Sequence, residues 1–139
     1  MAKSKLKDYI YRPEFECMTR TEMENLQSER LRKTVELVYN NCKPYRAKMD
    51  EFKIKPSDIR SVSDLSKLPF TVKHDLREAY PFGFYSSPSR DIVEVHASSG
   101  TTGKLTVVGY TQNDIDVWAE IAARSLAMAG VTKDSLVHV

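Results

Sequence analysis

The sequence has 139 residues, of which 41% are hydrophobic and 29% are charged. This length suits one domain, and this composition is typical of a folded globular protein rather than a disordered chain. Its 21 basic and 19 acidic side chains leave a net charge of only +2, so no dedicated nucleic-acid-binding protein is indicated. The most apolar segment, residues 121–130, contains Arg124 and is too short to span a bilayer. We therefore expect no nucleic-acid partner and no membrane partner.

The two cysteines and three histidines are scattered along the sequence. Cys17 and Cys42 do not form a C-x-x-C motif, which favours free thiols in a reducing cytoplasm over a disulfide scaffold. His74, His96 and His138 lack the close spacing of zinc ligands. The sequence therefore predicts a cytoplasmic protein without a metal site of its own.

The first long helix is predicted to begin near Thr21 and Glu24, which have the T-x-x-E spacing of a capping box. Apolar residues then recur at steps of three and four, as on one face of a helix. These residues are Leu31, Val35, Val38, Cys42 and Tyr45. Pro44 marks the expected end or kink, because proline lacks the backbone N–H that a helix interior requires.

Three prolines interrupt residues 43–70, which are expected to form short helical turns with Ser57 and Ser63 as caps. A short helix should follow, capped by Thr71 and ending at the Tyr80–Pro81 pair. Together with the first helix, these turns predict a helix-rich N-terminal segment over residues 1–90.

An aromatic, turn-rich connector follows at residues 82–89. Its aromatic side chains could line a groove, but residue preference favours a role in filling the core. Beyond it, the apolar runs at 92–95 and 105–110 are rich in β-branched residues and predict two strands.

A second long helix is predicted to open at Thr111, with Asp114 completing a weaker capping box. Residues at helical spacing are expected to line one face of this helix. They are Ile115, Trp118, Ala122, Ser125 and Ala129. Gly130 stands where a left-handed residue favours the end of a helix, and residues 136–139 are expected to start a third strand. Residues 91–139 therefore predict the start of a nucleotide-binding α/β region, and the whole chain an incomplete α/β fold.

The loop between the two strands is built almost entirely of small polar residues. We predict that seven of them bind phosphate: Ser98, Ser99, Gly100, Thr101, Thr102, Gly103 and Lys104. Glycines allow the backbone N–H groups to approach an anion closely, while the hydroxyls donate and Lys104 supplies a positive point charge. An ordinary Ser/Gly turn is the alternative.

This loop is not a Walker A motif. That motif requires its first glycine at position 98, where this sequence has Ser98, and Ser or Thr at position 105, where it has Leu105. The residues that follow predict a strand rather than a helix, so no helix dipole would support the anion. The G-x-S-x-G motif of a nucleophilic serine is absent as well.

The sequence resembles the N-terminal part of the phenylacetate–CoA ligase family, within the acyl-adenylate-forming superfamily. The resemblance rests on the segment 96–104 with its continuation 107–111. Residues 68–77, 80–83 and 123–131 reinforce it. The loop alone indicates only the superfamily, and the flanking segments indicate the branch that acts on aryl acids.

This resemblance implies a two-step ligase that uses ATP with Mg²⁺, an aryl acid and coenzyme A. The acid would form an acyl-adenylate with release of pyrophosphate, and the CoA thiol would then displace AMP. The loop residues 98–104 would hold the β- and γ-phosphates. Leu105 departs from the proline usual in this family, which would leave the exit of the loop less rigid, and His74 replaces a common acidic residue.

The other walls of such an active site lie beyond Val139 in the family, so no catalytic residue is assigned. We expect an N-terminal fragment or truncated product that has no ligase activity alone. A stand-alone interaction module is the alternative, because a terminal strand could pair with a second chain, as in a homodimer. Within the enzyme interpretation, a ligase for another aryl or acyl acid also stays open.

Overall fold

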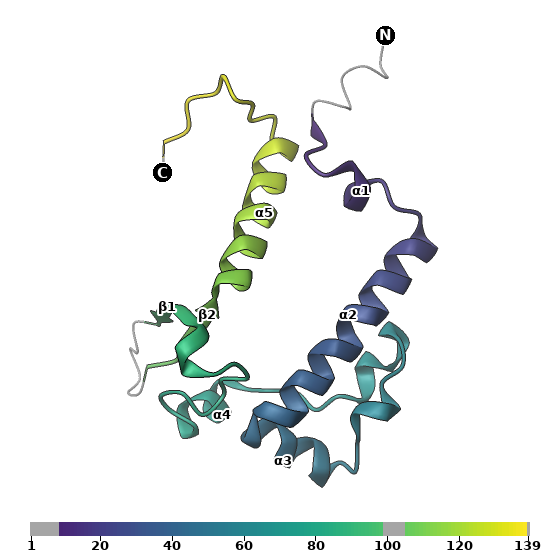
Figure 1. Cartoon of the computed structure of the whole chain (residues 1–139), viewed down its shortest axis with the longest axis vertical. Helices are drawn as coiled ribbons and strands as arrows, with labels where there is room; N and C mark the ends of the chain where they lie inside the picture. Colours follow the sequence, from purple (N-terminus) through teal and green to yellow (C-terminus); the bar gives the residue numbers. More distant parts are fainter. Residues whose placement is uncertain (1–8, 99–104, 139) are drawn as a thin grey trace. The chain divides into compact units, whose positions relative to one another are not determined.

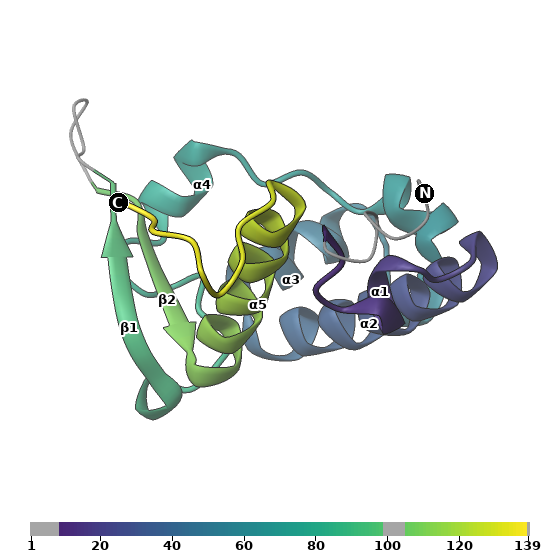
Figure 2. The ribbon, with the colours of Figure 1, turned by 90° about the horizontal axis from the view of Figure 1, so that it is seen from above.

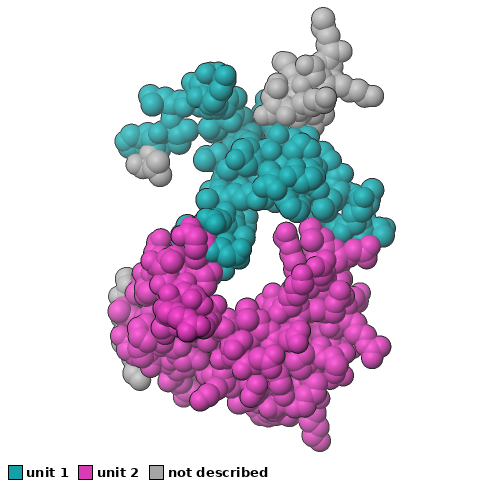
Figure 3. Space-filling model, in the orientation of Figure 1, with its two compact units in different colours: residues 1–23, 113–139 teal, residues 24–112 magenta. Residues whose placement is uncertain are grey.

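The computed structural model describes residues 9–98 and 105–138 (Figure 1). The chain divides into two compact units, one of residues 24–112 and one of residues 1–23 with 113–139 (Figure 3). Helices dominate, and a small two-stranded sheet follows the helical N-terminal half. The predicted division at residue 90 stays a prediction.

The long helix α2 spans Arg20–Asn41, and its N-terminal capping box is formed by Thr19 and Glu22. The Glu22 carboxylate accepts from the Thr19 N–H at 2.8 Å, and the Thr19 hydroxyl accepts from the Glu22 N–H at 3.3 Å. Two overlapping T-x-x-E patterns occur here, and the helix uses the earlier one. The predicted box at Thr21 and Glu24 is therefore wrong by two residues.

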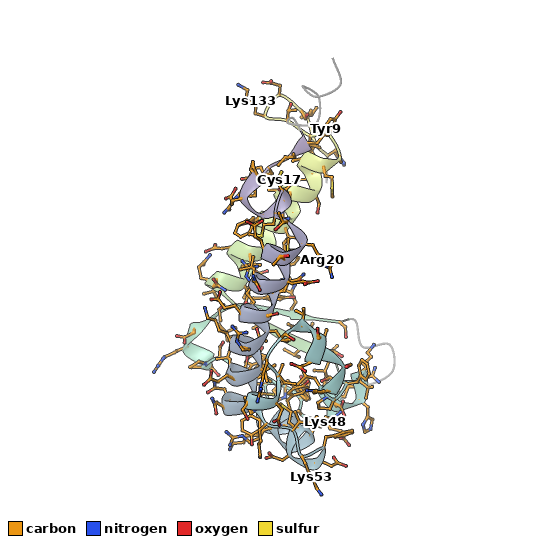
Figure 4. All side chains as sticks on the ribbon, turned by 90° about the vertical axis from the view of Figure 1, so that its right-hand side faces the viewer. Tyr9, Cys17, Arg20, Lys48, Lys53 and Lys133 are labelled. Atoms are coloured by element: carbon orange, nitrogen blue, oxygen red, sulfur yellow. The ribbon has the colours of Figure 1, made fainter. Side chains whose placement is uncertain are left out.

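Helix α3, Lys43–Glu51, carries Pro44 in its first turn. Proline is tolerated there because the first N–H groups of a helix have no partner inside the helix. Pro44 thus starts a new helix, after α2 has ended at Asn41. Lys53, two residues past the end of α3, adopts the left-handed φ of 57° (Figure 4).

The core of the larger unit lies where α2 and α3 meet the segment that follows them. Val35, Met49 and Ile59 are its fully buried members, at 3%, 0% and 1% exposure. Partly buried apolar side chains surround them: Leu31, Tyr39, Tyr45, Ile54 and Leu68. Cys42 is also buried, with a free thiol, and Cys17 is an exposed free thiol.

Three short helices follow: η2 (Pro56–Asp58), η3 (Val62–Lys67) and α4 (Lys73–Glu78). Each is capped by an aspartate three residues into the turn. Asp58 accepts from the Lys55 N–H at 2.8 Å, Asp64 from the Ser61 N–H at 3.1 Å, and Asp75 from the Val72 N–H at 2.8 Å.

The predicted caps Ser57, Ser63 and Thr71 are therefore wrong. Ser57 and Ser63 lie inside the short helices, and Thr71 lies one residue before the N-cap of α4. A charged carboxylate binds a backbone N–H more strongly than a neutral hydroxyl does. The end of α4 ahead of the Tyr80–Pro81 pair agrees with the prediction.

The two predicted strands form an antiparallel hairpin. After η4 (Ser89–Asp91), strand β1 (Ile92–Ala97) pairs with β2 (Val107–Thr111), as Figure 2 shows. The register pairs Val95 with Gly109 and Ala97 with Val107, with an irregularity between Ile92 and Glu94.

Helix α5, Gln112–Met128, follows β2 directly, and Gly130 just past its end adopts the predicted left-handed conformation with a φ of +89°. The Gly130 N–H donates to the Ala127 carbonyl at 2.8 Å, and the Val131 N–H to the Leu126 carbonyl at 3.0 Å. These two bonds form a Schellman motif.

The face of α5 that carries the predicted residues is mostly exposed. Ile115 is half-buried, but Trp118, Ala122, Ser125 and Ala129 are exposed. The half-buried stripe instead includes residues 120, 123, 124 and 127.

The N-terminal segment contacts part of that half-buried stripe of α5. Its helix α1 spans Pro13–Glu16. Arg12 binds Glu120 at 2.8 Å, and Arg124 binds Glu16 at 3.2 Å. These crossed ion pairs connect α5 to a segment more than one hundred residues earlier in the sequence.

The expected third strand is absent from the described residues: 136–138 have no strand conformation. A strand requires a neighbour for its backbone hydrogen bonds. Among the helices of residues 9–98 and 105–138, none has the length and apolar character needed to cross a membrane.

Candidate functional site

The candidate site is the end of the hairpin that carries the predicted phosphate-binding loop. The Ser98 N–H donates to the Thr106 carbonyl at 3.0 Å, and the Thr106 N–H donates to Ser98 Oγ at 3.2 Å. These bonds extend the pairing one step beyond Ala97 and Val107. Ser98 and Thr106 are thereby held side by side.

Of the seven predicted binding residues, Ser98 is the one that the structure describes. Its Oγ acts as an acceptor toward Thr106, so its hydroxyl proton remains available for donation. The other predicted residues lie outside the described part of the chain. They are Ser99, Gly100, Thr101, Thr102, Gly103 and Lys104.

One face of the hairpin carries a polar and aromatic cluster beside the loop. In an antiparallel pair, directly opposed residues point to the same face, and His96 is opposed to Val108 while Glu94 is opposed to Tyr110. The His96 Nε2 atom is in hydrogen-bond contact with the Glu94 carboxylate. The His96 ring also meets the Tyr110 ring edge-on, with 5.0 Å between centroids.

Tyr85 packs on β2 at Gly109, and sequence reasoning missed this contact. Burial raises the pKa of the Tyr85 phenol above its ordinary value. Among the described residues, Tyr85 Oη has no hydrogen-bond partner and is buried, as is Thr106 Oγ1. A glycine inside a strand is the signal that could have found this contact, because it often marks close approach of another group.

A second polar pair lies away from the hairpin, between α3 and α4. The Lys48 ammonium contacts the Asp75 carboxylate and also donates to the Phe70 carbonyl at 3.1 Å. Lys48 first and the Val72 N–H second lower the pKa of the Asp75 carboxyl. The pair joins the start of α4 to α3, which is a structural role.

A mostly apolar groove of about 620 Å³ lies beside this region. Tyr45, Leu65, Leu68 and Phe70 contribute to its walls. No three His, Cys, Asp or Glu side chains gather into a metal site within residues 9–98 and 105–138. The hairpin remains the place where sequence and structure together indicate ligand chemistry.

Known proteins resemble this chain strongly in sequence. Phenylacetate-coenzyme A ligase of Thermus thermophilus is 48% identical over 129 residues, which are 93% of this chain and 29% of the relative. Phenylacetate-coenzyme A ligase of Escherichia coli is 52% identical over 118 residues, which are 85% of this chain and 27% of the relative. The chain thus spans less than a third of the length of these curated relatives. No protein-family model matches it.

Solved structures agree with the sequence relatives. An open conformation of 2-hydroxyisobutyryl-CoA ligase, in complex with 2-HIB-AMP and CoA, aligns with a TM-score of 0.78 and 29% identity. The alignment covers 88% of this chain and 29% of the ligase. The same ligase in its thioesterification state also gives a TM-score of 0.78. These findings confirm the predicted fold class and the predicted resemblance. In sequence the chain is similar to the N-terminal portion of the phenylacetate–CoA ligases, and in fold it matches part of an acyl-CoA ligase.

Proposed function

We propose that this chain supplies the ATP phosphate-binding element of a phenylacetate-type CoA ligase. In the first step, a carboxylate oxygen of the acid attacks the α-phosphorus of ATP and pyrophosphate leaves. In the second step, the thiol sulfur of coenzyme A attacks the acyl carbon, AMP leaves, and the thiol proton passes to solvent. ATP would arrive as its Mg²⁺ complex.

The hairpin supports this proposal most directly. It holds Ser98 and Thr106, which lie on either side of the sequence Ser-Gly-Thr-Thr-Gly-Lys-Leu, side by side through their two hydrogen bonds. In the proposal, the hydroxyls of Ser98, Ser99, Thr101 and Thr102 donate to phosphate oxygens, and the backbone at Gly100 and Gly103 approaches them. Lys104 offsets the negative charge that builds up on the pyrophosphate as it leaves.

Phenylacetate is the acid that we propose. The relatives with that name are 48% and 52% identical to the chain, whereas the 2-hydroxyisobutyryl-CoA ligase is 29% identical. A ligase of the same kind for another aryl or acyl acid is the second candidate. Its support is that a ligase with a different acid shares the fold at a TM-score of 0.78.

Calorimetric titration of the 139-residue protein with Mg-ATP and with pyrophosphate tests the phosphate element. Lys104→Ala should weaken binding of both polyphosphates, because one positive charge is removed from the loop. Lys33→Ala removes the same charge from an exposed position on α2, where Lys33 is 74% exposed, and should leave binding unchanged. Equal affinities in the wild type and in Lys104→Ala would refute the role of Lys104.

A chimeric enzyme tests the acid and the reaction. The residues that match the Escherichia coli relative would replace the equivalent part of that ligase. We expect the chimera to form acyl-CoA and AMP from phenylacetate, and Lys104→Ala to reduce its rate. We propose that the 139 residues alone form neither product. Product formation by these residues alone would contradict that part of the proposal, and a chimera that folds but is inactive would contradict the functional equivalence.

A further inference from the structure

The centre of the hairpin is built around a contact between Tyr85 and Gly109. A Cβ atom added to Gly109 would lie 2.5 Å from Tyr85 Cζ, 2.7 Å from its Oη and 2.9 Å from its Cε2. Such distances lie far inside van der Waals contact, so the ring fits only because position 109 has no side chain. Gly109 is paired with Val95 of β1. Tyr85 therefore lies over the middle of the two-stranded ladder.

A tight turn directs Tyr85 toward this position. The Gly83 N–H donates to the Ala79 carbonyl at 2.8 Å, and the Tyr85 N–H donates to the Phe82 carbonyl at 3.0 Å. A Cβ on Gly83 would approach the Ala79 carbonyl oxygen to 2.7 Å. The Phe82 ring supports the Tyr85 ring with 5.2 Å between centroids. Gly83 thus allows the turn, and Gly109 leaves the space that the Tyr85 ring occupies.

The contact is one of van der Waals packing and involves no hydrogen bond of the Tyr85 hydroxyl. Among the described residues, Tyr85 Oη is buried without a partner, and an unpaired buried hydroxyl is destabilising. Phenylalanine should therefore serve at position 85 at least as well as tyrosine, whereas alanine should not.

The hairpin depends on such a cover, because a two-stranded hairpin alone is marginally stable in water. In the described residues the sheet consists of β1 and β2 alone. We infer that Tyr85 is a positioning residue, whose ring on Gly109 keeps β1 and β2 paired and so holds Ser98 beside Thr106. The consequence for phosphate binding rests on the function proposed above.

Amide hydrogen exchange of the 139-residue protein tests this inference. In Tyr85→Ala, the amides of β2 should exchange at least about tenfold faster than in the wild type. In Tyr85→Phe, they should exchange within about twofold of the wild-type rate or more slowly. The amides of α2 and α3 should keep their wild-type rates in both variants.

Gly109→Ala supplies an independent arm of the test. Alone, it should accelerate exchange in β2, because the new methyl group displaces the Tyr85 ring. Added to Tyr85→Ala, it should have little further effect, because the clash no longer exists. Additive effects in the double variant would overturn the claim that these two residues act through one contact.

Two further results would overturn the inference. One is unchanged protection of β2 in Tyr85→Ala. The other is equal loss of protection in α2 and α3, which would indicate general destabilisation rather than a role in the hairpin. Pyrophosphate titration of the same variants separates the inference from the proposed function. If the wild type binds and Tyr85→Ala binds equally well despite fast exchange, the link to the ligand is wrong. If the wild type does not bind, the proposed function fails for this chain, and the exchange data still decide the role of Tyr85.

Discussion

Replacing Met49 by alanine should strongly destabilise the larger unit. Met49 is 0% exposed and belongs to the buried cluster with Val35 and Ile59. Alanine removes three heavy atoms from that cluster and leaves a cavity that α2 and α3 can close only in part. Substitutions of this kind cost about 2–5 kcal/mol. Because whole domains are stable by only about 5–15 kcal/mol, this is a large share of the total.

Urea denaturation followed by far-ultraviolet circular dichroism measures this loss. With a denaturant dependence of about 2 kcal/mol per molar, a loss of about 3 kcal/mol lowers the midpoint by roughly 1.5 M. Phe70→Ala is the matched control, because it removes a larger apolar group from a side chain that is 90% exposed. We expect the control to change the stability by no more than about 0.5 kcal/mol.

Met49→Leu provides the second comparison. It nearly conserves the buried volume and should cost less than about 1.5 kcal/mol. If Met49→Ala and Phe70→Ala shift the midpoint equally, the core is not where α2 and α3 meet. If Met49→Leu is as damaging as Met49→Ala, lost volume is not the cause.

Two further predictions concern polar contacts. Ser28 is 8% exposed, and its Oγ accepts from the Val62 N–H at 3.1 Å. Ser28→Ala should therefore cost about 1–3 kcal/mol in urea denaturation, and a change below about 0.5 kcal/mol would show that the Val62 N–H finds another partner. Lys67, with the N–H groups of Arg60 and Ser61, lowers the pKa of the Asp64 carboxyl from 3.8 to about 2. A depressed carboxyl pKa stabilises the fold above the unfolded value, and this contribution is lost as the pH falls from 3.8 toward 2. The stability difference between the wild type and Asp64→Asn should shrink over that range, and a difference independent of pH would refute the assignment.

The local features of this chain could be predicted from short sequence patterns. The hairpin strands follow from two β-branched runs, and the end of α5 follows from Gly130, whose positive φ a glycine adopts without strain. The loop motif together with its flanking segments predicted the resemblance that the relatives confirm. Each of these features depends on residues that are neighbours in the sequence.

Other parts of the helices could not be predicted, because one sequence pattern was compatible with two structures. Thr19 and Glu22 form the same T-x-x-E pattern as Thr21 and Glu24, and only the observed hydrogen bonds distinguish them. Pro44 is equally compatible with the end of one helix and the first turn of the next. Periodicity likewise identifies apolar stripes on α5 without indicating which of them is covered.

Tertiary contacts decided these choices. Glu16 and Arg12 bind Arg124 and Glu120, so the N-terminal segment covers a stripe of α5 that its own periodicity did not indicate. Tyr85 reaches Gly109 from 24 positions earlier in the sequence. Residues 136–138 are apolar enough for a strand but form none, because a strand exists only when a neighbour completes its backbone hydrogen bonds. The sequence by itself determined the composition of the loop and the presence of a strand on each side of it. Apart from the start of β1 at Ile92, the strand bounds differ from the predicted runs 92–95 and 105–110 by one or two residues. The contact that supports the strands, between Tyr85 and Gly109, was visible only in the tertiary structure. Residues far apart in the sequence pack together only when the fold brings them close in space.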